Sequence, residues 1–147
     1  MDEFIKMLNE DYELVRYKIK ETKIIFEVAS SKKSCTCPYC GMLSSRVHSN
    51  YQREIQDLPI LNKQTILLVN TRKMFCDNPD CKVATFAERH PFVVKNGKKT
   101  ERLVANILAT SLQLSSINAS KLLNTEAIKV SKSSICTLIK KNAINYR

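Results

Sequence analysis

The sequence has no run of about 18 apolar residues, the length that a membrane-spanning helix needs. Its N-terminal stretch carries acids and lacks the continuous apolar segment of a secretory signal peptide. It also has no internal repeat and no low-complexity tract. Its 147 residues are enough for one ordinary domain or two small ones with a core that needs no disulfides. These absences predict a cytoplasmic protein with no membrane partner.

Acidic residues are scarce in the last third of the chain. Residues 91–147 contain ten Lys and Arg against two Asp and Glu, whereas residues 1–34 contain seven of each. Residues 35–90 contain seven basic and five acidic residues, so the net charge of +10 is concentrated toward the C-terminus. Such a basic segment favours an anionic partner, of which nucleic acid is the commonest. A solvated basic face without a partner is the alternative.

The run Cys37-Pro38-Tyr39-Cys40 matches the redox-active dithiol of a glutaredoxin. A dithiol catalyst needs its first cysteine at the N-terminus of a helix, where unpaired backbone N–H groups stabilise the thiolate. Here Gly41 to Ser45 follow the pair and predict a turn that leads to a strand. The pattern therefore favours a metal site, and a thiol–disulfide oxidoreductase that uses this dithiol is the alternative.

A second cysteine pair supports the metal site. Cys76 and Cys81 have four residues between them, and 35 residues separate Cys40 from Cys76. Two short cysteine loops joined by strands are typical of a zinc ribbon, in which four thiolates surround one ion and leave no position for a substrate. Disulfides are not expected for these cysteines in a reducing compartment. We predict one structural Zn²⁺ held by Cys37, Cys40, Cys76 and Cys81, and no catalytic residue.

The other cysteines and histidines have less specific interpretations. Cys35 could replace a ligand, but it is predicted to be an exposed neighbour of the site. Cys136 is predicted to be a small buried hydrophobic residue of a helix. His48 and His90 are expected on a strand surface or in structural hydrogen bonds, because four cysteines already complete a zinc coordination sphere.

Periodicity predicts the order of the secondary structure. Residues 2–9 form a short helix, and alternation of apolar and polar residues over 12–28 predicts a β-hairpin. Two further strands are predicted over 45–52 and 64–75, with a turn between them at Asp57-Leu58-Pro59.

A helical period begins at Lys98 and predicts three helices. The first runs from Lys98 to near Gln113 and the second over about 116–123. Ser131 is the expected N-cap of the third. The seven residues 124–130 make a longer connection than the three or four residues usual in a helix-turn-helix.

The third predicted helix has the layout of a DNA recognition helix. Ile135, Leu138 and Ile139 would turn inward, leaving hydroxyl and lysine side chains outward. Hydroxyls near the helix start can approach base edges, while lysines meet phosphates. A plain three-helix bundle with a basic face is the alternative. The predicted DNA contacts are Lys98, Lys99, Arg102, Ser131, Lys132, Ser133, Ser134, Thr137, Lys140 and Lys141.

Together these patterns predict the α+β class, with small antiparallel strands followed by a three-helix bundle of the helix-turn-helix type. We expect three consecutive domains. Residues 1–34 form an N-terminal helix and β-hairpin, residues 35–90 a zinc ribbon, and residues 91–147 a helix-turn-helix DNA-binding domain.

These motifs resemble the N-terminal part of the insertion-sequence transposases of the ISL-three family. The resemblance covers most of the chain from Cys37 onward. It is carried by the runs CPYCG at 37–41, RVHS at 46–49, YQR at 51–53, DLP at 57–59, FCDNPDC at 75–81 and TFAER at 85–89. It implies a zinc-binding domain and a helix-turn-helix that together recognise the terminal inverted repeats of the element, with zinc ligands at Cys37, Cys40, Cys76 and Cys81.

The resemblance also implies a ribonuclease-H-like catalytic domain that lies further along such proteins. After residue 90 this chain has only Glu101 and Glu126, too few carboxylates for a two-metal phosphoryl-transfer site. We therefore expect a module that binds double-stranded DNA without cutting it, and no small-molecule substrate. A homodimer, a zinc-ribbon adaptor for another protein, and a transcriptional regulator that binds the same element ends are open alternatives.

Overall fold

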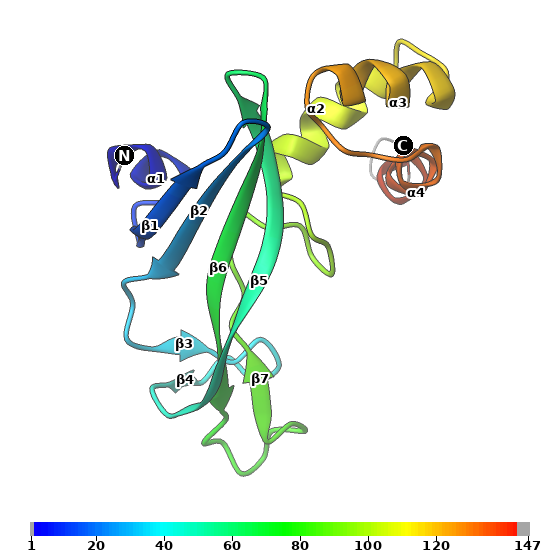
Figure 1. The fold of residues 1–147 in the computed structure, drawn as a ribbon. Helices are drawn as coiled ribbons and strands as arrows, with labels where there is room; N and C mark the ends of the chain where they lie inside the picture. Colours follow the sequence, from blue (N-terminus) through cyan, green and yellow to red (C-terminus); the bar gives the residue numbers. More distant parts are fainter. Residues whose placement is uncertain (1, 144–147) are drawn as a thin grey trace. The chain divides into compact units, whose positions relative to one another are not determined.

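The computed structural model describes residues 2–143 (Figure 1). The elements are α1 (Asp2–Leu8), β1 (Tyr12–Ile19), β2 (Lys23–Ser30), β3 (Cys35–Thr36), β4 (Leu43–Ser44), β5 (Val47–Ile60), β6 (Lys63–Phe75), β7 (Thr85–Ala87), α2 (Glu101–Ser111), α3 (Ser116–Thr125) and α4 (Lys132–Ala143). The predicted α+β class is confirmed. None of the helices in these residues is long and apolar enough to cross a membrane.

The strands form two sheets. The larger has the order β1-β2-β6-β5, with β7 paired to β6, and the smaller contains only β3 and β4. β6 carries β-branched and apolar residues at Thr65, Ile66, Leu67 and Val69, all of them buried, which suits a strand in the interior of a sheet.

The chain divides into two compact units built from interleaved segments. Within the described residues, the first unit contains 2–17, 26–54 and 67–92, and the second contains 18–25, 55–66 and 93–143. The segments alternate because the long strands β5 and β6 each contribute to both units. The division into three consecutive domains stays a prediction.

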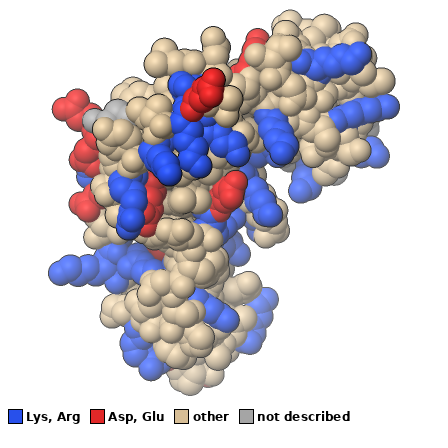
Figure 2. Space-filling view, viewed as in Figure 1, with Lys and Arg blue, Asp and Glu red and all other residues tan. Residues whose placement is uncertain are grey.

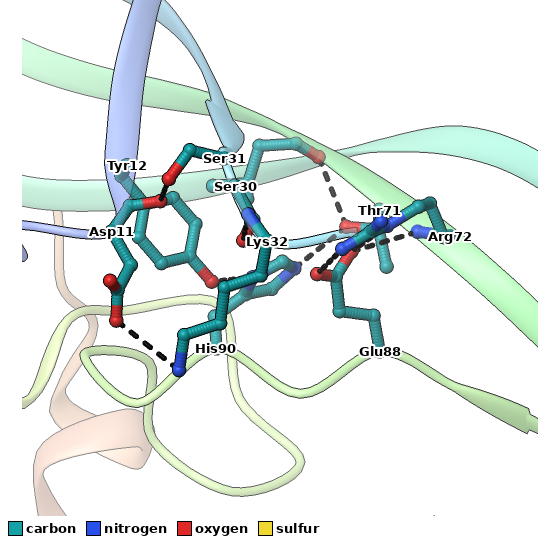
Figure 3. A network of polar contacts seen from close by, with 10 residues as sticks. Asp11, Tyr12, Ser30, Ser31, Lys32, Thr71, Arg72, Glu88 and His90 are labelled. Carbon is teal, nitrogen blue, oxygen red and sulfur yellow. Dashed lines mark hydrogen bonds and ion pairs between the residues drawn. The ribbon is translucent and has the colours of Figure 1, made fainter. Parts of the chain in front are cut away.

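His90 lies in the interior of the first unit, between Tyr12 and Thr71 (Figure 3). The Tyr12 hydroxyl is 2.5 Å from Nδ1, and the Thr71 hydroxyl oxygen is 3.0 Å from Nε2. Thr71 donates its one hydroxyl proton to the Val69 carbonyl, so its oxygen must accept from Nε2. His90 is therefore the neutral Nε2–H tautomer, and the prediction of structural hydrogen bonding for this residue is confirmed.

An ion pair lies beside this histidine. Arg72 donates to both carboxylate oxygens of Glu88, at 3.2 and 2.7 Å (Figure 3). Burial alone would raise the pKa of Glu88, but the hydrogen bonds and charge of Arg72 lower it below its ordinary value. The pair thus links β6 to the segment that follows β7.

The turn between β5 and β6 lies at Leu61 and Asn62, so the prediction of a turn at Asp57-Leu58-Pro59 is wrong. Leu61 and Asn62 have φ angles of 50° and 61°, as a two-residue hairpin turn of type I′ requires. Asp57 stays within β5 because its side chain is buried and accepts hydrogen bonds from Thr100 and Arg102. These long-range contacts override the local turn signal.

Each of the three C-terminal helices begins at a hydroxyl residue. Thr100, Ser115 and Ser131 each accept a hydrogen bond from the backbone N–H three residues later, at 3.3, 3.2 and 3.1 Å. The predicted cap at Ser131 is confirmed. The predicted start of the first helix at Lys98 is wrong, because the Thr100 cap sets the start of α2 at Glu101.

Helices α2, α3 and α4 share one apolar core in the second unit. Its buried members are Leu103, Ile107, Ala119, Leu123, Ile128, Val130 and Ile135. Two of these, Ile128 and Val130, come from the connection between α3 and α4. The connection is long because it supplies core residues as well as a turn.

The buried state of His90 predicts a pH dependence of stability. Burial lowers its pKa to about 4 from an ordinary 6.5, so between these values the unfolded chain binds a proton that the folded chain excludes. We expect the unfolding free energy to fall as the pH falls through this window, with His90 contributing about 3 kcal/mol of the loss.

The variant His90→Gln can accept from Tyr12 and donate to Thr71 without titrating, so it should lose less stability over the same range. Urea unfolding of both proteins at several pH values measures the difference. An identical pH dependence would contradict a buried, neutral His90.

Candidate metal centre

Four thiols from two distant segments meet in the first unit. The sulfur atoms of Cys37, Cys40, Cys76 and Cys81 all lie within 4.8 Å of one another. The Cys37–Cys81 and Cys40–Cys76 sulfur pairs are 3.9 and 3.5 Å apart. Tetrahedral zinc with four sulfurs at about 2.3 Å places each pair of sulfurs about 3.8 Å apart. The cluster therefore fits one zinc ion with four thiolate ligands.

The first cysteine pair lies on a tight loop between β3 and β4. The Cys37 N–H donates to the Met42 carbonyl and the Gly41 N–H donates to the Cys37 carbonyl, each at 2.9 Å. Gly41 has a φ of 78°, which a residue with a Cβ atom adopts only at a cost. The glycine thus allows the chain to fold back directly after Cys40.

The second pair lies on the connection from β6 to β7. The Cys76 N–H donates to the Ala84 carbonyl at 2.9 Å and the Cys81 N–H donates to the Asn78 carbonyl at 3.1 Å. The Asn78 side chain in turn accepts from the Asp80 N–H at 3.0 Å, an Asx turn. These bonds return Cys81 to the side of the loop where Cys76 lies.

Backbone donors point at three of the four sulfurs. The donor–sulfur pairs are Met42 with Cys40, Asn78 with Cys76 and Val83 with Cys81. Such hydrogen bonds stabilise a thiolate, and the Met42 N–H is the main cause that lowers the pKa of Cys40 to about 6. Desolvation and the neighbouring thiols outweigh the backbone donors at Cys76 and Cys81 and raise the pKa of both. Zinc binds thiolates and not thiols, so the metal supplies the positive charge that four converging thiolates need.

A small apolar cluster includes three of the four cysteines of the site, Cys37, Cys76 and Cys81. Its other buried members include Met74 and Phe86. On the outside, the Lys82 ammonium lies 5.3 Å from the centre of the Tyr39 ring, a cation–π contact. This contact joins the two cysteine loops a second time, independently of the metal.

The expectation that Cys35 is exposed is wrong. Its side chain is 9 % exposed and belongs to the apolar cluster beside the site. The alternation of β3 explains this position, because Cys35 turns inward where Thr36 turns outward. Burial raises the pKa of Cys35 to about 11, so it stays a thiol. It lies outside the group of four convergent sulfurs.

Cys136 and His48 are also outside the metal site. Cys136, expected to be buried, is half-buried on α4, and its thiol donates to the Ser116 hydroxyl at 3.4 Å. His48 is an exposed residue of β5, as expected of a strand surface, and its ring meets the Phe75 ring edge-on at 5.0 Å.

The predicted DNA contacts on the third helix lie along α4. Lys132, Ser133, Thr137, Lys140 and Lys141 are exposed, Ser134 is half-buried, and Ser131 caps the helix. Ile135 is fully buried on the opposite face, as predicted. At 100° per residue, Ser133, Thr137, Lys140 and Lys141 share one exposed face of the helix, and Lys132 lies beside that face in the first turn.

Lys98, Lys99 and Arg102 have a different environment. The two lysines lie in the extended segment before α2, where the Lys98 carbonyl accepts from the Gln56 N–H at 2.9 Å. Arg102 is held by the buried carboxylate of Asp57, with Nε 2.8 Å from Oδ1. This anchor was not visible in the sequence, because 45 positions separate the two residues.

Elemental analysis of the purified protein should give one zinc per chain. The variant Cys76→Ser should lose the ion and at least about 3 kcal/mol of unfolding free energy, because metal binding is part of the folding free energy of such a site.

Cys136→Ser and Cys35→Ala are matched controls that also remove a thiol, and both should retain one zinc. Loss of zinc from Cys35→Ala would show that the ligand assignment is wrong.

A family model described as the zinc-finger of transposase IS204/IS1001/IS1096/IS1165 matches residues 33–81 of the chain. The matched segment contains all four convergent cysteines. No curated protein and no solved structure matches the chain. Residues 33–81 are thus a zinc ribbon domain of the type found in ISL-three transposases, and their tetracysteine cluster is the site of one zinc ion.

Proposed function

We propose that the protein is a zinc-stabilised DNA-binding module of a transposase and that it recognises the terminal inverted repeats of an insertion sequence. The observation that carries the proposal is the match of residues 33–81 to a transposase zinc finger whose four cysteines converge in the structure. In this role the zinc is structural, and the chain binds the duplex without cutting it.

Helix α4 is the element that we assign to the major groove. Its exposed face presents hydroxyl groups near the N-terminus and two lysines in the last turn. Hydroxyl side chains can hydrogen-bond to base edges, while lysines and a helix N-terminus favour phosphate oxygens. The same helix is anchored by Ile135 in the shared core, so its orientation is set by packing.

Helices α3 and α4 would form the helix-turn-helix, with α2 as the supporting helix. Their connection at 126–131 is longer than the usual turn, but Ile128 and Val130 bury their side chains in the same core. Ala127 adopts a φ of 64° and reverses the chain after α3. The connection is therefore held in place at two points, which a recognition helix requires.

The charge of the second unit supports an anionic partner. In Figure 2 blue side chains outnumber red ones over the region of α2, α3 and α4. The segment 91–147 has only two acids, so its basic side chains have few partners of opposite charge within that segment. Uncompensated basic charge of this kind attracts the phosphate backbone at long range.

A thiol–disulfide oxidoreductase is the first alternative. The short loop after Cys37 is closed by turns and not by a helix, so no helix N-terminus stabilises that thiolate. The Cys40 sulfur also lies 3.5 Å from the Cys76 sulfur of the second loop, as a shared metal ion requires. An exchange assay with the metal-free protein distinguishes the two functions, because only the oxidoreductase would be active in it.

A zinc-ribbon adaptor for another protein is the second alternative. It predicts no preference for any duplex over random DNA.

A regulator that represses transcription at the same element ends is a sub-case of the favoured function. A homodimer is compatible with the transposase module and with the regulator.

The test is selection from a library of random duplexes with the zinc-loaded chain, followed by mobility-shift titration of the selected duplex and a scrambled one. We expect the selected duplex to be bound at least about 100-fold more tightly than the scrambled one. Chelation of the zinc should remove the preference. Equal binding of both duplexes would overturn the proposal.

Lys140 and Lys141 should contribute to the salt dependence of binding. Each phosphate contact adds about −0.9 to the slope of log K against log salt, so replacing both lysines by Ala should flatten the slope by up to about 1.8. Replacing the exposed Lys6 and Lys33 removes the same charge elsewhere and should change the slope little. An unchanged slope in the first variant removes α4 lysines from the interface.

A further inference from the structure

Leu61 has the highest exposure among the large apolar side chains in residues 2–143. Its exposed fraction is 85 %, and it lies at the turn that joins β5 to β6 (Figure 1). Because so little of the Leu61 side chain is covered, it contributes little to the packing of the fold.

The backbone of Leu61 is also unfavourable for leucine. Its φ of 50° is in the left-handed region, where Cβ comes close to the following carbonyl oxygen. Asn, Asp and Gly are the usual residues at this turn position. The other non-glycine residues with positive φ in the described part of the chain are Asn62, Asn96 and Ala127, all smaller than leucine. A bulky residue kept in a strained, exposed position points to a role outside the fold.

This turn and the neighbouring hairpin end are rich in lysine. The Lys63 ammonium donates to the carbonyls of Lys20 and Glu21, so the β5–β6 turn lies against the β1–β2 turn within the second unit. We call residues 18–23 and 61–64 together the tip. Its basic residues are Lys18, Lys20, Lys23 and Lys63, and Glu21 is its one acid. None of the ion pairs found in residues 2–143 involves these lysines.

A groove connects the tip to the segment that precedes α4. Thr22 and Asn62 line it on the side of the tip, and Asn124 and Lys129 line it on the side of the helices. All four residues belong to the second unit. The tip and the proposed recognition helix are therefore parts of one compact body.

We propose that the tip is a second DNA contact, in which Leu61 enters the minor groove and wedges between two base pairs while the surrounding lysines meet phosphates. This inference rests on the proposed function and adds bending of the duplex to it. An apolar side chain inserted at a base step partly unstacks it and kinks the duplex, which brings more DNA against the protein. The turn that carries Leu61 has only two residues, so this part of the tip is narrow, as an element that enters a groove must be.

The chemistry of the tip fits DNA better than a protein partner. The core of a protein interface is a contiguous apolar patch with few charges. Leu61 is followed by the polar Asn62 and Lys63 and has lysines on the adjacent turn. Leu61, 85 % exposed, and Ile19, 57 % exposed, are the large apolar side chains that the tip exposes among its four lysines. So small an apolar area within positive charge is instead the composition of a minor-groove wedge.

The test replaces Leu61 with Asn, a residue that favours the left-handed turn. The variant Leu61→Asn should raise the thermal midpoint by about 3 °C, because strain is relieved. On the duplex selected by the wild-type chain, its affinity should fall about tenfold. 2-Aminopurine placed at successive steps of that duplex should brighten at one step with the wild type and at none with the variant. A more stable protein that binds DNA less well cannot be explained by damage to the fold.

Leu112→Asn is the matched control. Leu112 is 80 % exposed, but its φ of −68° is right-handed and without strain, so this variant should bind and unstack the duplex as the wild type does. A second variant, Lys20→Ala with Lys23→Ala, should flatten the salt slope and keep the fluorescence signal, since it removes charge and leaves the wedge.

The outcomes separate the two proposals. If the wild-type chain selects no duplex, the proposed function and the wedge fail together. If it selects a duplex that Leu61→Asn binds with equal affinity and equal fluorescence, only the wedge is overturned. Equal DNA binding together with a change of oligomeric state in that variant would assign Leu61 to a protein contact instead.

Discussion

Coordination of one zinc ion by four thiolates is the interaction on which the ribbon at residues 33–81 depends. Three of the four strands that flank the cysteine loops are very short, with two residues in each of β3 and β4 and three in β7, and only β6 is long. The three short strands make few hydrogen bonds and bury little apolar surface. The local apolar cluster is correspondingly small, with Met74 and Phe86 at its centre. A metal that joins two loops far apart in sequence supplies the stability that this core lacks.

The two compact units are held by different forces. The first combines thiolate coordination with the buried chain of hydrogen bonds from Tyr12 through His90 to Thr71. In the second, three helices close over an apolar core, and the buried carboxylate of Asp57 fixes the start of α2 through Thr100 and Arg102. In the proposed function this separation is useful, because the ribbon can carry metal while the helical core orients the DNA-binding face.

A prediction from the sequence agrees with the structure where a clear signal lies within a few neighbouring residues, and it fails where that signal is weak or misleading. The cap at Ser131 was predicted correctly, since a capping hydroxyl needs only the three residues that follow it. The turn at Leu61 was missed because leucine is a poor residue for a left-handed turn, whereas Asp57-Leu58-Pro59 carries a stronger local signal. Cys35 was placed on the surface because the strand that turns it inward has only two residues, too few for alternation to be recognised.

By itself the sequence determined the zinc ligand set, the basic C-terminal third and the presence of helices there, because spacing, composition and period are properties of the chain alone. Only the tertiary structure decided that Asp57 anchors Arg102, that His90 is buried and neutral, and that two hairpin turns form one basic tip around Leu61. Each of these depends on residues that lie far apart in sequence and meet only after the strands pair. The physical reason is that the burial of a side chain and the choice of its charged partner are set by the packing of the whole chain and not by its local segments.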